Sequence, residues 1–208
     1  MHWRDRHPAP RAVLAATAVG AMITAVCMLA VDKPVARVLG GYEPSAVWDN
    51  GIALLEWTLG LPVLRLFSSL ALVVGMLVVM TVPRLRGWAP AWIVVAGTHV
   101  VCRFLTVHIK DATGRLRPAE WLAQGGEGTF FREGIAFPSG HVALFASILV
   151  PLAILAPRTR PLLLVVVFVS LARIAVNAHF VSDALGSITL AALVAWLLAR
   201  AVRPFRTG

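Results

Sequence analysis

The sequence has few charged residues, and it contains no internal repeat or low-complexity tract. Of its 208 residues, 14% are charged and 59% are hydrophobic, whereas soluble domains have roughly 25% and 45–50%. This shortage of charge, together with the apolar excess, excludes a disordered chain and argues against a water-soluble globule. We therefore expect an integral membrane protein.

Cysteine is also scarce, and both cysteines, Cys27 and Cys102, lie in apolar runs. We expect two free thiols. The cysteines and histidines lack the spacing of a metal site, so we expect no metal and no other cofactor. Since no linker divides the chain, we expect a single membrane-embedded domain over residues 1–208, with its motif-bearing core at about 88–201.

Six runs are apolar enough for membrane-spanning helices, which need about 20 residues, or fewer with suitable flanks. The stretch 45–64 instead mixes Asp49 and Glu56 with Trp48 and Trp57, a pattern typical of an interfacial amphipathic helix. The predicted fold is all-α, an integral membrane bundle of six transmembrane helices with this interfacial segment between helices 1 and 2. The six predicted spans are 12–31, 66–82, 88–109, 142–156, 161–176 and 184–199.

The first apolar run follows a basic leader that contains Arg4, Arg6 and Arg11, so a signal peptide is one interpretation. The run is longer than a typical signal sequence, and no convincing cleavage site follows it. We expect a retained membrane anchor.

The net charge of +9 by itself would suit a nucleic-acid partner, but its distribution indicates orientation instead. One side of the predicted bundle holds ten basic residues against one acid, and the other holds nine of each. Because cytoplasmic loops are enriched in Lys and Arg, we expect both termini in the cytoplasm of a multi-pass protein of the cell (inner) membrane. We expect no nucleic-acid partner. The ten residues are Arg4, Arg6, Arg11, Arg84, Arg86, Arg158, Arg160, Arg200, Arg203 and Arg206.

Three polar clusters fall on the opposite, extracytoplasmic side. Because the orientation is derived from loop charge alone, their presence on one side is an independent observation. Each has a simpler explanation, because a lysine at the edge of a span can snorkel, arginines can bind lipid headgroups, and a serine can cap a helix. Together, however, they place ionisable groups at a membrane boundary, where such groups tend to mark function. The clusters are Lys110, Arg115 and Arg117; Ser139, Gly140 and His141; and Arg173, His179 and Asp183.

The combined chemistry suits a phosphate ester. Arginine and lysine bind anionic oxygens, and a helix that begins near Ser139 would add backbone N–H donors. On a helix, His179 and Asp183 would share a face, so that Asp183 could orient His179 as a nucleophile. His141 could then protonate the leaving oxygen, and the two histidines would need no metal.

The motifs Lys-x6-Arg-Pro, Pro-Ser-Gly-His and Arg-x5-His-x3-Asp, in this order, resemble those of the type 2 phosphatidic acid phosphatase superfamily over residues 12–201. The resemblance implies a six-helix membrane phosphatase acting on lipid phosphates or pyrophosphates. It also implies a phosphohistidine on His179, with Asp183 as its orienting partner and His141 as the general acid. The phosphate-binding residues that it implies are Lys110, Arg117, Ser139, Gly140 and Arg173.

Two positions fall outside this pattern. Arg115 lies within the first motif but does not define it, and we hold it as a candidate headgroup contact. Ala172 stands where the superfamily commonly has serine before the arginine of the third motif, from which we expect an altered phosphate fit rather than an inactive protein.

The biological lipid stays open among undecaprenyl pyrophosphate, phosphatidylglycerol phosphate, phosphatidic acid and a lipid A phosphate. The glycine-containing loop 118–137 suits either a mobile lid or a solvated connector, and its aromatic residues suit the membrane interface or a lipid chain. A lipid phosphotransferase using the same intermediate is the main alternative. Haloperoxidases with these motifs are larger soluble proteins, and an anion or lipid transporter would leave the histidines unexplained. The oligomeric state is not predicted.

Overall fold

The computed structural model describes residues 10–64 and 66–202, and this part of the chain forms helices without a strand. Three helical runs in it are long and apolar enough to cross a membrane, namely Ala12–Leu39, Pro83–Thr113 and Val181–Ala201. The predicted all-α class is confirmed.

Each of the six predicted apolar runs lies in a helix. The first comprises α1 (Pro10–Val26), which continues through the π-helical turn η2 (Cys27–Val31) into α2 (Asp32–Leu39). Two of the others, Phe67–Thr81 and Gly140–Leu155, are apolar but shorter than the three long runs. The remaining helices of the set are α4 (Phe67–Thr81), α5 (Ala89–Thr113), α7 (Gly140–Leu155), α8 (Leu163–Ala175) and α9 (Val181–Ala201).

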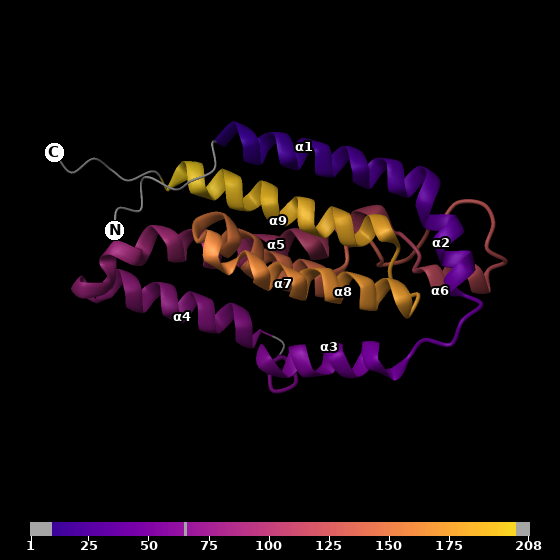
Figure 1. Ribbon diagram of the computed structural model, residues 1–208, viewed down its shortest axis with the longest axis horizontal. Helices are drawn as coiled ribbons and strands as arrows, with labels where there is room; N and C mark the ends of the chain where they lie inside the picture. Colours follow the sequence, from indigo (N-terminus) through magenta and orange to yellow (C-terminus); the bar gives the residue numbers. More distant parts are fainter. Residues whose placement is uncertain (1–9, 65, 203–208) are drawn as a thin grey trace.

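Helix α7 occupies the centre of the bundle, where it packs against α5, α8 and α9 (Figure 1). Its residues from Val142 to Ser147 are buried in succession, on all sides of the helix, as expected of an apolar helix enclosed by others. Helix α1 covers α9, and α4 covers α5. A methyl group at Gly20 of α1 would lie 2.7 Å from Thr189 Oγ1, so glycine permits the close approach of α1 to α9.

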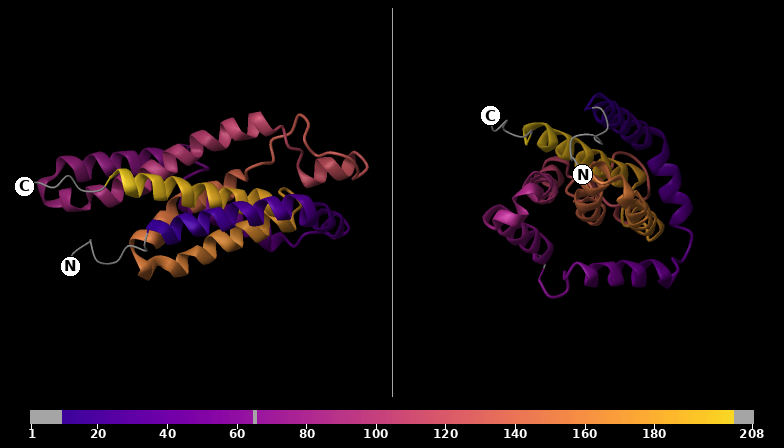
Figure 2. Two further views of the ribbon diagram at one scale, coloured as in Figure 1. Left: turned by 90° about the horizontal axis from the view of Figure 1, so that it is seen from above. Right: turned by 60° about the vertical axis from the view of Figure 1, so that its left-hand side comes forward.

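Helix α3 (Ala46–Thr58) lies at the periphery of the bundle, beside α8 (Figure 2). It begins where the Ser45 hydroxyl accepts a hydrogen bond from the backbone N–H of Val47 at 3.3 Å. It carries Asp49 and Glu56, and Val47, Leu54 and Trp57 are exposed on it.

The predicted sidedness of the loops has a counterpart in the structure. The turns η3 (Pro83–Trp88) and η4 (Pro157–Leu162), with the end of α9, lie at one end of the bundle (Figure 1). The short helix α6 (Pro118–Ala123), α2 and the first turns of α7 and α9 lie at the other. The first end carries Arg84, Arg86, Arg158, Arg160 and Arg200, whereas Arg4, Arg6, Arg203 and Arg206 lie outside the described residues.

The two cysteines are free, as predicted. Cys102 is buried in the core between the helices, with 1% of its surface exposed.

Candidate active site

The three sequence motifs meet at one end of the bundle. The backbone N–H of Ser139, just before α7, donates to the carbonyl oxygen of Asp183 in the first turn of α9, at 3.2 Å. A methyl group at Gly140 would lie 3.9 Å from Lys110 Cε in the last turn of α5. The backbone N–H of His179 donates to the carbonyl of Arg173 at 3.1 Å, so the end of α8 is tied to the same place.

His179 and Asp183 are in contact, but they do not share a helical face as the sequence interpretation assumed. His179 precedes α9, and Asp183 occupies its first turn. The Asp183 carboxylate turns back toward the helix start, where Oδ2 accepts from Phe180 N–H at 2.9 Å and lies 3.4 Å from His179 Nδ1. The contact therefore arises from helix capping. With Nδ1 directed at the carboxylate, Nε2 is the ring nitrogen that Asp183 leaves unoccupied.

The second oxygen of Asp183 is held by a buried network that the sequence interpretation did not include. Arg115 Nη1 donates to Asp183 Oδ1 and, at 2.7 Å, to Ser182 Oγ. Arg115 Nη2 donates to Asp32 Oδ2 at 2.6 Å. Asp32 in turn accepts from the backbone N–H of Ser182 at 3.0 Å and from its hydroxyl. The start of α2 is thus joined to the Asp183 carboxylate through Arg115.

Arg115 is not accessible to a lipid headgroup in this structure. Its side chain is fully buried, and its guanidinium lies 4.3 and 4.4 Å from the ring centroids of Phe130 and Phe180, which are themselves adjacent. A guanidinium that packs against two neighbouring rings and pairs with two carboxylates is held in one position. Arg115, which we expected as a candidate headgroup contact, is internal because the loop that carries Phe130 folds over it.

Four buried donor groups at the site have no hydrogen-bond partner among the described residues. One is Nε of the enclosed Arg115, and the other three are Ser139 Oγ, Arg117 Nε and Arg173 Nε. Ser139 occupies the N-cap position of α7, as expected, but its hydroxyl makes no capping bond. The charges of Arg117 and Arg173 act on each other, and that of Arg117 also acts on Lys110. Buried unpaired donors are costly, and like charges held together repel, so this arrangement suits an anion.

The loop 118–137 is bound to the chain that precedes it. Leu116 N–H donates to the carbonyl of Phe130 at 2.8 Å, and Ala136 N–H donates to that of Arg115 at 2.7 Å. Lys110 Nζ donates to the carbonyl of Ile135. At Gly114, where φ is +54°, a methyl group would collide with the carbonyl of Arg132 at 2.0 Å. These bonds place the loop over the end of α5 in the conformation seen here.

The aromatic residues of this loop separate into buried and exposed positions. Trp121 and Phe130 are buried and pack with Leu116 and Phe180, whereas Phe131 is 45% exposed. The prediction that these aromatic side chains lie at the membrane interface or meet a lipid chain is therefore wrong for Trp121 and Phe130, because they form the small core that encloses Arg115.

His141, in the first turn of α7, has a partner that was not anticipated. Its Nε2 lies 2.6 Å from Glu56 Oε1 on α3. About a third of each side chain is exposed, 32% for His141 and 30% for Glu56. If Nε2 donates to Glu56, Nδ1 is the nitrogen free to exchange a proton with a bound ligand. The peripheral helix α3 therefore reaches the site through one residue.

Burial sets the protonation state of His179. The side chain is 3% exposed, and its burial lowers the pKa of the imidazole, while the hydrogen bond and the charge of Asp183 oppose this shift and Lys110 and Arg173 reinforce it. The neutral imidazole, which is the nucleophilic form, is favoured.

The residues that the sequence interpretation missed are Asp32, Glu56 and Ser182. Asp32 ends an apolar run and Glu56 lies in an amphipathic segment, so each had an adequate local explanation, and only their remote partners reveal the role. Ala172, where the resemblance suggests a serine, is fully buried in the helix core. Among the described residues, no group of three or more His, Cys, Asp or Glu side chains forms a metal-binding cluster.

One comparison with known proteins gives a match. The family model of the PAP2 superfamily matches residues 90–206, more than half of the chain. This match begins at the start of α5 and includes all three motifs. No curated protein and no solved structure matches the chain.

Proposed function

The chain belongs to the PAP2 superfamily, whose members are phosphatases, and we propose that it hydrolyses a lipid phosphate or lipid pyrophosphate in the membrane through a phosphohistidine intermediate. The coarser activity, a hydrolase of phosphate esters, follows from the superfamily. We propose three further points: the lipid substrate, the phosphohistidine intermediate and the orientation in the membrane.

The observation that carries the proposal is the set of unpaired buried donors at Ser139, Arg117 and Arg173. They lie in the same site as Lys110 and the first turn of α7. A phosphoryl group offers several anionic oxygens and would satisfy all of them at once. The backbone N–H groups at the start of α7, next to Gly140, would add the positive end of the helix dipole.

In the first step, His179 Nε2 attacks phosphorus and an N–P bond forms as the bond from phosphorus to the leaving oxygen breaks. His141 gives a proton to that oxygen, so the alcohol or lipid phosphate departs. Asp183 stabilises the charge that develops on the imidazole, because Oδ2 faces Nδ1 at 3.4 Å. The cations hold the phosphoryl oxygens throughout.

In the second step, water attacks the phosphohistidine and breaks the N–P bond. His141 takes a proton from this water, and inorganic phosphate leaves. His179 returns to its neutral form, which its buried position favours. If a second lipid replaced water as acceptor, the same residues would transfer the phosphoryl group, and the protein would be a phosphotransferase.

The bundle suits a lipid substrate. Besides the three helical runs long enough to span, we propose that α4, α7 and α8 also cross the membrane, which gives six spans. We further propose that the arginine-rich end of the bundle faces the cytoplasm and that the site faces outward, with α3 in the interface. A lipid would then enter the site at the membrane edge.

The test is a panel of lipid monophosphates and pyrophosphates incubated with the purified protein in detergent with a chelator. Free phosphate and phosphorylated acceptor lipid are both measured. We expect phosphate release that persists without divalent metal, and acid-labile phosphate trapped on the wild-type protein. His179→Ala should abolish both signals.

His108→Ala is the matched control, because His108 is an exposed histidine of α5 whose one hydrogen-bond partner within residues 10–64 and 66–202 is the Phe104 carbonyl, at 2.9 Å, and whose ring packs on that of Phe104. It should retain wild-type turnover. Full activity of His179→Ala would contradict the nucleophile assignment. Phosphate that appears on acceptor lipid instead of in solution would establish the transferase.

A further inference from the structure

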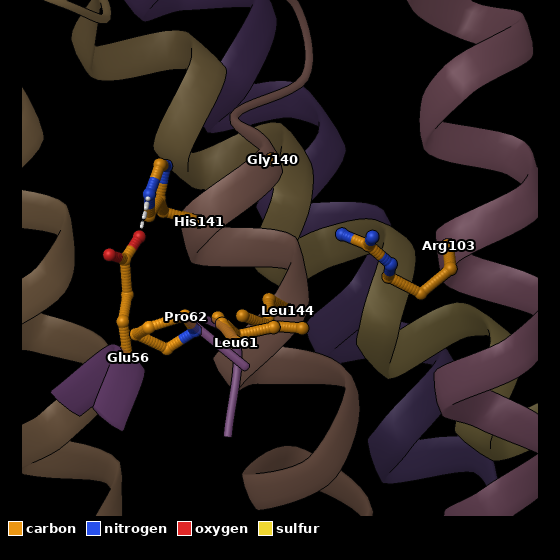
Figure 3. Close-up of a pocket in the computed structure, with 7 residues that line it drawn as sticks. All are labelled: Glu56, Leu61, Pro62, Arg103, Gly140, His141 and Leu144. Atoms are coloured by element: carbon orange, nitrogen blue, oxygen red, sulfur yellow. Dashed lines mark hydrogen bonds and ion pairs between the residues drawn. The ribbon is translucent and has the colours of Figure 1, made fainter. Parts of the chain in front are cut away.

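A cavity of about 520 Å³ opens beside the catalytic residues. Gly140 and His141 form one side of it, and Leu61 and Leu144 provide apolar walls. Figure 3 shows Arg103 on the opposite side, where its guanidinium extends from α5 toward the start of α7. The cavity therefore continues from the general acid to a cation outside the three motifs.

Arg103 is an unusual residue for its place. It lies within the run Pro83–Thr113, which is long and apolar enough to cross a membrane, and Phe104 beside it is exposed. In the described part of the chain, no hydrogen bond or ion pair involves its side chain. Glu56, the acid that lines the same cavity, is held by His141 at 2.6 Å. A membrane-embedded charge is costly and commonly serves a ligand.

The position of Arg103 relative to the phosphate site is set by α5. Lys110 follows it by seven residues, so both lie on one face of the helix, about 10 Å apart along its axis. Both side chains are long enough to reach into the space between them. A scissile phosphate at Lys110 would leave its departing part near His141, with Arg103 beyond.

We propose that Arg103 binds a second phosphate carried by the leaving group, and thereby selects lipids with two phosphate groups. This inference rests on the proposed function and narrows its substrate class. The two sources of such chemistry are a lipid pyrophosphate and a phosphatidylglycerol phosphate, whose second phosphate is a diester. Phosphatidic acid has only the scissile phosphate and leaves an uncharged diacylglycerol, so it gains nothing from Arg103.

The test compares Arg103→Gln and Arg103→Lys on an isoprenyl pyrophosphate, phosphatidylglycerol phosphate and phosphatidic acid. A charge-assisted hydrogen bond predicts that Arg103→Gln lowers kcat/KM about ten- to a hundredfold for substrates with two phosphates. Phosphatidic acid should change by less than about twofold, and Arg103→Lys should recover part of the loss. Of the two lipids with two phosphate groups, the one whose kcat/KM falls more identifies the distance between phosphates that the site accepts. Arg160→Gln, an exposed arginine at the other end of the bundle, is the matched control and should behave as wild type.

A binding measurement keeps this inference separate from catalysis. In a His179→Ala background, an isoprenyl methylenebisphosphonate should bind more tightly than the corresponding monophosphonate, and Arg103→Gln should remove that difference. An equal loss on all three lipids, no loss on any, or an unchanged binding ratio would overturn the role of Arg103. If the wild-type protein releases phosphate from no lipid, the proposed function itself fails, while the binding ratio still decides whether Arg103 recognises a second phosphate.

Discussion

Arg115 Nη2 lies 2.6 Å from Asp32 Oδ2, and both side chains are fully buried. Because Arg115 Nη1 also holds Asp183, this ion pair connects the start of α2 with the residue that we propose orients His179. Asp32 therefore acts on the proposed nucleophile from a distance, through Arg115 and Asp183.

Asp32→Asn is expected to impair both stability and turnover. The change would leave a fully buried arginine with Asp183 as its one remaining carboxylate, and breaking a buried ion pair costs about 3–5 kcal/mol. We expect a lower thermal midpoint in detergent and a lower kcat, with KM changed little because the phosphate-binding residues stay in place. Glu43→Gln, at an exposed position, serves as the control. An unchanged kcat would remove Asp32 from the positioning of the nucleophile.

Ser139→Ala is expected to reduce activity without reducing stability. The hydroxyl makes no capping bond and has no partner among the described residues, so its removal leaves no partner unsatisfied and should not lower the free energy of unfolding. Loss of a hydrogen bond to a charged phosphate should lower kcat/KM about ten- to a hundredfold.

Ser182→Ala provides the opposite pattern for comparison, because its hydroxyl accepts from Arg115 at 2.7 Å and donates to Asp32. It should lose about 1–3 kcal/mol of stability. A Ser139→Ala variant that unfolds as readily as Ser182→Ala would indicate a structural role for Ser139.

In a plot of kcat/KM against pH, we expect the fall on the acid side to lie below the ordinary histidine pKa of about 6.5. Burial lowers the pKa of His179, so the neutral nucleophile persists below pH 6.5 and is lost only as the pH falls through the lowered pKa. Asp183→Asn removes a charge that raises this pKa, so the fall on the acid side should move to still lower pH while kcat decreases. Rates measured from pH 4 to pH 8 test this, and a fall on the acid side above pH 6.5 would contradict it.

Glu56→Gln is expected to weaken general-acid catalysis. The carboxylate holds His141 Nε2 at 2.6 Å and favours its protonated form. The variant should lose about ten- to a hundredfold in kcat on lipid phosphates, whose leaving oxygens need a proton. On p-nitrophenyl phosphate, whose leaving group departs without one, its kcat should be close to that of wild type. An equal loss on both substrates would show that Glu56 does not act through His141.

The orientation of the bundle can be tested with a pair of cysteines in a protein with Cys27 and Cys102 replaced by alanine. Glu127→Cys lies in the exposed part of the loop near Gly125, and Gly87→Cys lies at the arginine-rich end, where no atom is within 4 Å of an added Cβ. An impermeant maleimide should label Glu127→Cys in intact cells, and Gly87→Cys only after permeabilisation. The reverse pattern would invert the proposed topology.

Much of this arrangement can be predicted from the sequence because it depends on local chemistry. A long apolar run in a membrane favours a helix because a helix satisfies its own backbone hydrogen bonds, and all six predicted runs are essentially helical in the structure. The motifs likewise carry their own residue types and spacing. Their order along the chain was sufficient to nominate His179, His141 and the phosphate-binding cations, and the match over residues 90–206 supports the superfamily that they indicated.

Only the tertiary structure shows which residues far apart in the chain contact each other. Asp32 and Arg115 are 83 residues apart, and Glu56 and His141 are 85 apart, and no periodicity relates such pairs. The contact of His179 with Asp183 depends on where α9 begins, which is set by capping. Whether Arg115 is exposed depends on how the loop 118–137 folds back. Residue types therefore determined the chemistry that this chain can perform, whereas long-range packing determined which charged groups are buried together and which remain for a ligand.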